Sequence, residues 1–543
     1  MRIKRISIRN FRSIKCLDFL PSELCALIGG NNTGKSNILK ALNLVLGDSW
    51  PSTRSISEED FFGYDTSEDM VISVWFDEKQ TVTGDVGDQQ DFSGIQFRVT
   101  KYQRKSGKHV KGDPKSEFVC IDDSGNPVTV LRRNPRAAAS SKPHPQVAGV
   151  TQDIRDNLPT VMVDVDRNAK YHLSGNRYTI FGRLLLDVSK KLKQDAERYK
   201  EFEEKFEEAR KVLRTDDFNV LTQKITEQVQ SHTGMTGIDI ALDGIDPINL
   251  YKSFSILFKD SFTPQSVDVE RMGSGIQSAV VISLLQAYRE LRKESAVLLF
   301  EEPELFLHPH GRRHLYRLLC DLSENGTQVI YTTHSQDFVD LAKIESVQLV
   351  SRNVDEGTIV QGTSTQNVSS KQKQRRRLVR EFSAPRNEIF FANSVILVEG
   401  PTEQATIRFL APMMSPSLDL DFLNCSVIEV GGKDQLPLYI KMVHALGKKL
   451  LVIYDSDSHH VEAKDIATDN KRKEEIDSAL GDRDEVFVCD PYLEEMAGVE
   501  GHTKRDKERQ MRDFLESIGA WDELSLNVQS LMDKIAIFVR DSS

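Results

Sequence analysis

The chain has 543 residues, of which 39% are hydrophobic and 28% are charged, and its formal net charge is −11. A chain of this length is too long to fold around a single hydrophobic core, so two or three domains are expected. The composition is typical of a globular protein and excludes a disordered one. No apolar run is long enough to cross a bilayer, and the start MRIKRISIRNF has a strand pattern rather than that of a signal peptide. We therefore expect no membrane partner.

The cysteines are far apart in the sequence and show no C-x-x-C spacing, which argues against a zinc site and for reduced thiols in a cytoplasmic protein. They are Cys16, Cys25, Cys120, Cys320, Cys425 and Cys489. The acidic net charge does not indicate a DNA-binding protein by itself, because phosphate contacts need clustered Lys and Arg. Any DNA-binding face must therefore be local.

The first 45 or so residues are predicted to form strand, turn, strand, glycine-rich loop and helix, and residues 67–135 alternate as antiparallel hairpins do. Residues 181–230 change to long, charged helices, which form either a solvated face or an insertion used for self-association. Residues 246–350 return to the strand–helix alternation of a parallel sheet. The basic segment 371–380, KQKQRRRLVR, precedes a second strand–helix series. This segment, with Arg375, Arg376, Arg377 and Arg380, is either a DNA-backbone contact or an exposed linker helix.

The sequence GGNNTGKS at 29–36 follows an apolar strand and opens a helix, as a phosphate-binding P-loop does. Its glycines let backbone N–H groups surround phosphate oxygens, Lys35 reaches the β- and γ-phosphates, and Ser36 ligates Mg²⁺. We predict that ATP is bound by Gly29, Asn31, Asn32, Thr33, Gly34, Lys35, Ser36 and Asn37.

Three later elements complete an ATPase pattern. The apolar strand 297–300 ends in carboxylates, which directs Glu301 at Mg²⁺ and Glu302 at the attacking water. Before it, Gly273-Ser274-Gly275 precedes a helix and resembles the signature loop with which one ABC-type subunit touches the γ-phosphate held by another. After it, His334 ends a strand, at the position of a switch histidine. Each element alone is a weak signal. It is their order along the chain, after the P-loop, that predicts an ATPase.

A second acidic pattern follows residue 395. One apolar strand ends in Glu399-Gly400 with Glu403 beyond it, and a later strand ends in Asp455-x-Asp457. The carboxyl ends of two parallel strands would bring these four carboxylates into one cleft, where their mutual repulsion requires divalent cations. Two Mg²⁺ or Mn²⁺ ions about 3.5–4 Å apart would clamp the oxygens of a phosphodiester.

The E-G…D-x-D pattern, with Gly432-Lys433 between the two strands, resembles the Toprim domain. The Asn10-Phe11-Arg12 turn and the E-E-P-E…L-H-P run resemble RecF-like and OLD-like ATPases, and the order ATPase then Toprim resembles the OLD family. The resemblance implies that Glu399 is a general base or metal ligand and that Glu403, Asp455 and Asp457 are metal ligands. It also implies a late acidic ligand, Glu494 or Glu495, and a late catalytic lysine, for which Lys534 is the first candidate and Lys504 the second.

The predicted fold class is α/β: an ABC-type ATPase head with a helical insertion, then a Toprim domain. The expected segments are 1–184 and 246–385 for the two lobes of the head, 185–245 for an insertion that could dimerise, and 386–543 for Toprim. The domain boundary is placed near the basic segment.

The predicted function is nucleotide-regulated, metal-dependent DNA cleavage. The resemblance implies a role in bacterial defence against phage or in DNA processing, a homodimer or higher oligomer, and for some relatives a helicase or a retron reverse transcriptase with its RNA. Two alternatives stay open. In one, the protein is an ATP-dependent DNA sensor or clamp whose Toprim domain recruits partners without cutting. In the other, nucleotide is only sensed and represses the nuclease.

Overall fold

The computed structural model describes most of the chain, and every structural statement below concerns these residues. They are residues 1–47, 49–102, 113–133, 142–157, 160–165, 169–176, 179–213, 215–216, 220–226, 247–251, 256–259, 266–291, 296–363, 384–458, 463–499 and 504–541.

The N-terminal part is built on one 11-stranded sheet that mixes both kinds of strand pairing. Its strands, in spatial order, are β6 (Asp113–Ile121), β5 (Gln89–Tyr102), β4 (Met70–Thr83), β1 (Ile3–Phe11), β2 (Ile14–Phe19), β15 (Gly357–Gly362), β14 (Val347–Asn353), β3 (Leu24–Ile28), β13 (Thr327–Thr333), β12 (Ala296–Glu301) and β9 (Thr160–Val163). The strands from β14 to β9 pair in parallel, and those from β6 to β2, with β15, pair antiparallel. Both expectations, the early hairpins and the later parallel sheet, are confirmed.

Helices cover the parallel half of this sheet, because its strands are apolar on both faces and must be shielded from water on both. The helices of this part are α1 (Lys35–Leu46), α2 (Gln152–Asp156), α3 (Ala169–His172), α4 (Ile180–Gln194), α5 (Ala196–Leu213), α7 (Pro247–Tyr251), α8 (Ser274–Leu291) and α9 (Pro309–Glu324). Short two-stranded ribbons add β7 (Thr129–Arg132) with β8 (His144–Val147), and β10 (Phe258–Lys259) with β11 (Ser266–Val267).

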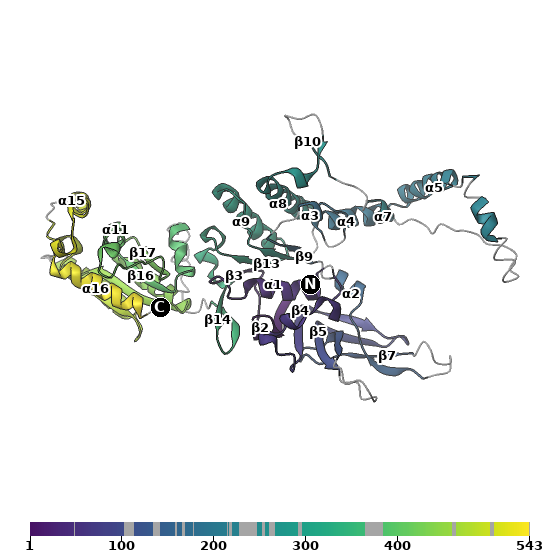
Figure 1. The fold of residues 1–543 in the computed structure, drawn as a ribbon, viewed down its shortest axis with the longest axis horizontal. Helices are drawn as coiled ribbons and strands as arrows, with labels where there is room; N and C mark the ends of the chain where they lie inside the picture. Colours follow the sequence, from purple (N-terminus) through teal and green to yellow (C-terminus); the bar gives the residue numbers. More distant parts are fainter. Residues whose placement is uncertain are drawn as a thin grey trace.

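The charged stretch predicted to be helical does form helices α4 and α5. Helix α5 extends away from the sheet, on the side opposite the C-terminal part (Figure 1). Its self-association stays a prediction, and residues 227–246 of the proposed insertion lie outside the described residues. The basic segment 371–380 also lies outside them, so its helix and its DNA contact stay predictions, as do the domain boundaries.

The C-terminal part has its own four-stranded parallel sheet, ordered β17 (Cys425–Glu429), β16 (Ser394–Val398), β18 (Lys449–Asp455) and β19 (Glu485–Cys489). Its helices are α11 (Pro401–Leu410), α12 (Leu436–Ala445), α13 (Ala463–Asp477), α14 (Leu493–Met496), α15 (Lys504–Ser517) and α16 (Leu526–Arg540). Alternate residues of β16 enter different cores: Val395 and Leu397 pack with α12, whereas Ile396 and Val398 pack with α11 and α16.

Two 3-10 segments join the parts, η5 (Gln336–Phe338) after β13 and η8 (Ala384–Phe390) before β16. Phe338 and Val339 belong to the same buried cluster as Ile389 and Phe390, so one apolar core runs from the large sheet into the small one. The junction is therefore a packed interface, through which a displacement on one side can reach the other.

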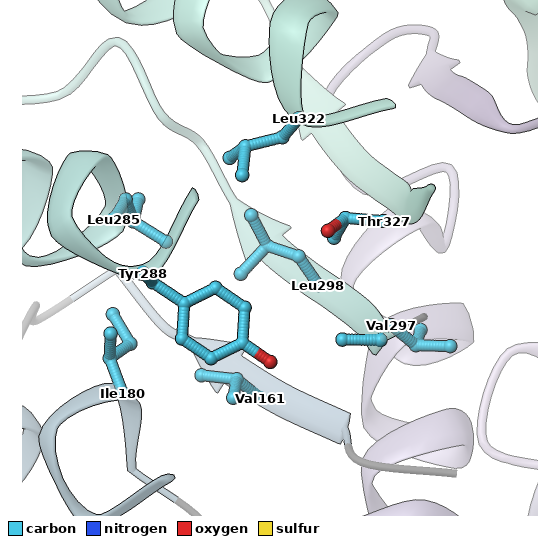
Figure 2. Close-up of a pocket in the computed structure, with 9 residues that line it drawn as sticks. Val161, Ile180, Leu285, Tyr288, Val297, Leu298, Leu322 and Thr327 are labelled. Atoms are coloured by element: carbon cyan, nitrogen blue, oxygen red, sulfur yellow. The ribbon is translucent and has the colours of Figure 1, made fainter. Parts of the chain in front are cut away.

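A small apolar cavity lies beside β12, lined by Val161, Ile180, Leu285, Tyr288 and Leu298 among others (Figure 2). Its volume, about 10 Å³, is no more than one water molecule needs, and its apolar lining offers almost no hydrogen bond. It is a packing gap in the core and carries no chemistry. Among the described helices, none combines the length and apolar character that crossing a bilayer requires.

Candidate functional site

The glycine-rich loop connects buried strand β3 to helix α1, and Lys35 lies inside it. The Lys35 ammonium donates to the carbonyl oxygens of Gly29 and Gly30 at 3.0 and 2.8 Å. Burial lowers the pKa of Lys35 to about 8, while the nearby carboxylates of Glu302 and Glu304 act to raise it. A lysine between the loop and the acidic strand is placed to receive an anionic phosphate.

The side chains of Ser13 and Thr358 support the loop by hydrogen bonds to it and to the start of α1. Thr358 Oγ1 donates to Thr33 O at 2.8 Å and lies 2.8 Å from Ser13 Oγ, which accepts from Asn37 Nδ2 at 2.8 Å. Gly34 has φ 104°, and a Cβ there would meet Thr358 Oγ1 at 2.1 Å, so only glycine fits. Sequence reasoning missed Ser13 and Thr358, because their role depends on distant strands meeting under the loop.

Asn37 was assigned to nucleotide binding, and the structure uses its side-chain amide in this support. Thr33 Oγ1 donates to Gly30 O at 3.0 Å within the loop. Asn31 and Asn32 are exposed at its tip, and Ser36 is half-buried at the start of α1.

The acidic strand end faces the same loop. Glu301 ends β12 and is buried, and Glu302 follows with φ 46° and donates its N–H to Thr332 O at 3.1 Å. Glu304 Oε1 accepts the backbone N–H of His334 at 2.7 Å, and burial raises the pKa of Glu304. Burial and the charge of Lys35 lower the pKa of His334, which favours a neutral imidazole. Glu304 is a site residue to which the sequence reading gave no role, although the E-E-P-E spacing contains it.

The fold brings Lys35, Glu301, Glu302 and His334 to one end of the parallel strands, and their roles toward ATP stay predictions. Ser274 is not part of this group: it begins α8 with its side chain exposed. A signature element that serves another copy's nucleotide would be exposed in this way, so its role stays a prediction.

The second site lies at the carboxyl edge of the small sheet. Glu399 follows β16 and Asp455 ends the neighbouring β18, and Glu399 Oε1 accepts the Asp455 N–H at 2.9 Å. Burial raises the pKa of Glu399 to about 7, and the charges of Glu403 and Asp457 add to the rise. Burial likewise raises the pKa of Asp455 to about 9, with further increases from Glu403, Glu399, Glu494 and Asp457. Glu399 and Asp455 are therefore both affected by the negative charges around them.

Two further carboxylates of the cluster come from helix N-termini. Glu403 is buried in the first turn of α11, and its Oε2 accepts the Gly400 N–H at 3.1 Å. Glu494 lies in α14, next to Leu493, whose N–H donates to Asp455 Oδ1 at 3.3 Å. Of the two late candidates, Glu494 is the one that raises the pKa of Asp455, and Glu495 is exposed. Glu494 is therefore the better fifth member.

The cation of this cluster is Lys433. Its ammonium, buried in the loop after β17, donates to Asp455 O at 2.5 Å and to Asp457 Oδ2 at 3.1 Å. It also lies 5.3 Å from the centre of the Tyr454 ring. The Gly432-Lys433 pair is visible in the sequence. That the lysine compensates the charge of the carboxylates is not, because this depends on β17 lying beside β16.

The late lysine candidates lie elsewhere. Lys534, on α16, forms an ion pair with Glu485, the first residue of β19. Asp455 pairs with Cys489, at the opposite end of that strand, and at about 3.3 Å per residue Glu485 lies roughly 13 Å along β19 from Cys489. The structure therefore does not support a catalytic role for Lys534, because α16 packs along the strand rather than over its end. The side chain of Lys504 lies outside the described residues.

The donor set suits Mg²⁺ or Mn²⁺, because these ions prefer hard carboxylate oxygens and the carboxylates here are buried and mutually repelling. Within the described part of the chain, no three Asp, Glu, His or Cys side chains already converge on one point as metal ligands. The Lys433 ammonium on Asp457 supplies positive charge to the cluster in this arrangement. Holding an ion would therefore require these side chains to rearrange, starting from carboxylates whose charges already act on Glu399 and Asp455.

Comparison with known proteins covers both parts. Residues 1–339 match the AAA ATPase domain, and residues 390–457 match the Overcoming lysogenization defect protein-like TOPRIM domain. An OLD nuclease from Thermus scotoductus is 29% identical over 537 residues, which is 95% of each chain. The Old nuclease of Escherichia phage P2 is 24% identical over 479 residues, covering 84% of this chain and 77% of its own.

Among solved structures, the SMC head domain from Thermotoga maritima aligns with 67% of this chain and 100% of its own, at 15% identity and a TM-score of 0.30. The predicted fold class is confirmed by the two family matches together with the mixed large sheet and the parallel small one. The chain belongs to the AAA ATPase domain family and joins that domain to the OLD-like TOPRIM domain, the organisation of the OLD nucleases.

Proposed function

We propose that the protein is a DNA nuclease that cuts phosphodiester bonds with divalent cations at the Toprim cluster, under the control of ATP bound in the head. The observation that carries this proposal is the burial of Glu399 and Asp455 in one cluster with Glu403, Asp457 and Glu494. Carboxylates held so close against their own repulsion are characteristic of a metal-dependent site. The names of the relatives, OLD nuclease, add support.

In this proposal Glu403, Asp455, Asp457 and Glu494 hold the cations, which when bound supply an activated water and neutralise charge on the phosphate. Glu399, with a pKa near 7, is suited to accept a proton at neutral pH. Lys433 contributes positive charge beside Asp457, where a phosphodiester would approach.

ATP would be held by the backbone amides of the glycine-rich loop, Lys35 and Ser36, with Mg²⁺ at Ser36 and Glu301. Contacts running from this site to the cluster support regulation. His334 is followed by Gln336, which donates to Glu388 Oε1 at 3.2 Å, and Glu388 lies 3.6 Å from Arg408 on α11. Helix α11 carries Glu403, so a shift at His334 can reach a metal ligand.

Cleavage of plasmid and linear DNA tests the proposal, with Mg²⁺ or Mn²⁺, with and without ATP, for wild type, Glu399→Ala and Lys35→Ala. We expect Glu399→Ala to abolish cutting and Lys35→Ala to change only its response to nucleotide. Whether ATP stimulates or represses is read from the wild type. If the wild type cuts no DNA but binds it in an ATP-dependent way, the hypothesis of a DNA sensor or clamp replaces the nuclease hypothesis.

We also propose DNA as the partner, a homodimer in which Ser274 of one copy completes the nucleotide site of another, and a cytoplasmic location. The unpaired thiols of all six cysteines support that location. We also propose a role in defence against phage, as the resemblance to the OLD family implies, and plaque counts on cells that express wild type or Glu399→Ala test it. Equal plaque counts would favour general DNA processing.

A further inference from the structure

A hollow of about 320 Å³ lies directly beside the Toprim cluster and shares Lys433 and Asp457 with it. One wall is the carboxyl edge of β18 and β19, with Tyr454, Ser456 and Val488. Helix α13 forms another part of the lining, with Ile466, Asn470 and Lys473. A ligand whose reactive group is held by the cluster would therefore extend into this hollow.

Part of the lining of the hollow is apolar and is open to water, as the lining of a ligand-binding surface is. Ile466 and Val488 are large aliphatic residues that leave 43% and 40% of their surface in water, one on α13 and one on β19. The Tyr454 ring also lines the hollow; it is buried, and the Lys433 ammonium lies 5.3 Å from its centre. Two exposed aliphatic side chains and an aromatic ring in the lining of one hollow suit a flat apolar group.

The polar part offers donors to an anion. The Lys473 ammonium and the Asn470 carboxamide make no hydrogen bond or ion pair with any residue that the structure describes. The hydroxyls of Ser456 and Ser458 are already used, since both donate to Asp490 Oδ1, at 2.5 and 2.6 Å. The two carboxylates that line the hollow are compensated: Asp457 by Lys433, and Asp469 by Arg472 at 3.4 Å.

We propose that this hollow is a nucleotide subsite of the nuclease: it holds the nucleotide next to the bond being cut, with its base between Ile466 and Val488 and its phosphate on Lys473. Apolar contact with a base is tolerant of sequence, because every base has an apolar face. The subsite would therefore position a DNA strand without reading its sequence. This inference rests on the proposed nuclease function.

Binding of two fluorescent single strands tests it: an oligothymidylate, and a strand of the same length built from abasic deoxyribose phosphates. The full-length Glu399→Gln protein is used with Mg²⁺, so that the strand stays intact. We expect Ile466→Ala with Val488→Ala to reduce the preference for the base-bearing strand at least about threefold. Lys473→Ala should weaken both strands alike and lower the salt dependence by about 0.7 in log–log slope, the loss of one phosphate contact on a single strand.

The matched controls are Lys471→Ala, on the same helix but not lining the hollow, and Leu526→Ala, an exposed aliphatic residue on α16. Both should behave like the parent protein. An unchanged preference in the Ile466/Val488 variant, or equal effects of Lys471→Ala and Lys473→Ala, overturns the subsite while the nuclease stands. If neither strand binds and the wild type cuts no DNA, the nuclease proposal fails and the subsite fails with it.

Discussion

Gln336 Nε2 lies 3.2 Å from Glu388 Oε1, and this hydrogen bond joins the loop after His334 to the segment that leads into the Toprim sheet. Next to it, Asn387 Nδ2 donates to the carbonyl oxygens of Gln336 and Val339 at 2.9 and 3.0 Å. All three bonds are made by side-chain amides, and they lie next to the apolar core that the two parts share. A rotation of the loop that carries His334 would therefore displace the segment that leads into the Toprim sheet.

Replacing Gln336 with Ala should weaken the effect of nucleotide on DNA cutting and leave cutting without nucleotide intact, because the cluster itself is untouched. Coupling energies of about 1–3 kcal/mol are typical, so the ATP-dependent change should fall several-fold. Cleavage rates with and without ATP measure this, and Gln80→Ala, at a half-buried glutamine on β4 far from this junction in the sequence, is the control. A full ATP response in Gln336→Ala would remove this contact from the route.

The metal-free protein should lose stability as pH rises through neutrality. Folding raises the pKa of Glu399 from 4.5 to about 7 and that of Asp455 from 3.8 to about 9, so the folded state binds more protons than the unfolded chain between those values. The stability present below pH 4 is therefore lost progressively up to about pH 9, by at most about 1.4 kcal/mol per pH unit for each group.

Thermal melting in EDTA from pH 5 to 9 measures this loss. Mg²⁺ or Mn²⁺ should raise Tm more at pH 8 than at pH 6, since ligands must be deprotonated to bind. Asp455→Asn should flatten the profile. An equal metal effect at both pH values would contradict the assignment of these carboxylates as ligands.

Lys433→Met should destabilise the metal-free protein by about 3 kcal/mol, since removing one partner leaves Asp457 and its neighbours uncompensated in a buried cluster. Divalent cations should recover much of this loss, because they supply the missing charge. Urea unfolding with EDTA and with Mn²⁺ measures both effects, and Lys433→Arg, which keeps the charge, is the comparison. A Lys433→Met protein as stable as wild type in EDTA would show that the ammonium is dispensable.

Gly34→Ala should abolish nucleotide binding and lower stability, because its Cβ would meet Thr358 Oγ1 at 2.1 Å and Ser13 Oγ at 2.6 Å. Gly30→Ala in the same loop is a matched comparison for stability, since its Cβ meets nothing closer than Thr33 Cγ2 at 3.6 Å. Fluorescent-nucleotide binding and urea unfolding measure the two effects. Equal stability of the two variants would refute the support that Ser13 and Thr358 give the loop.

What the sequence by itself determined is local chemistry. The glycine-rich loop, the acidic strand ends and the Toprim carboxylates each lie at the end of an apolar run, and parallel strands place such ends on one edge of a sheet. That rule holds wherever the strands are found in the sheet, so Glu399 and Asp455 could be paired before their neighbours were known. The order of the motifs was enough for the two-part organisation.

Only the tertiary structure decided which residues from distant segments meet. Lys433 reaches Asp457 because β17 lies next to β16, and Thr358 supports Gly34 because β15 pairs with β2. Lys534 shows the reverse: a lysine late in the chain looked suitable, yet α16 places it at the far end of β19. Strand order and helix direction arise from long-range packing, and no local pattern of residues encodes them.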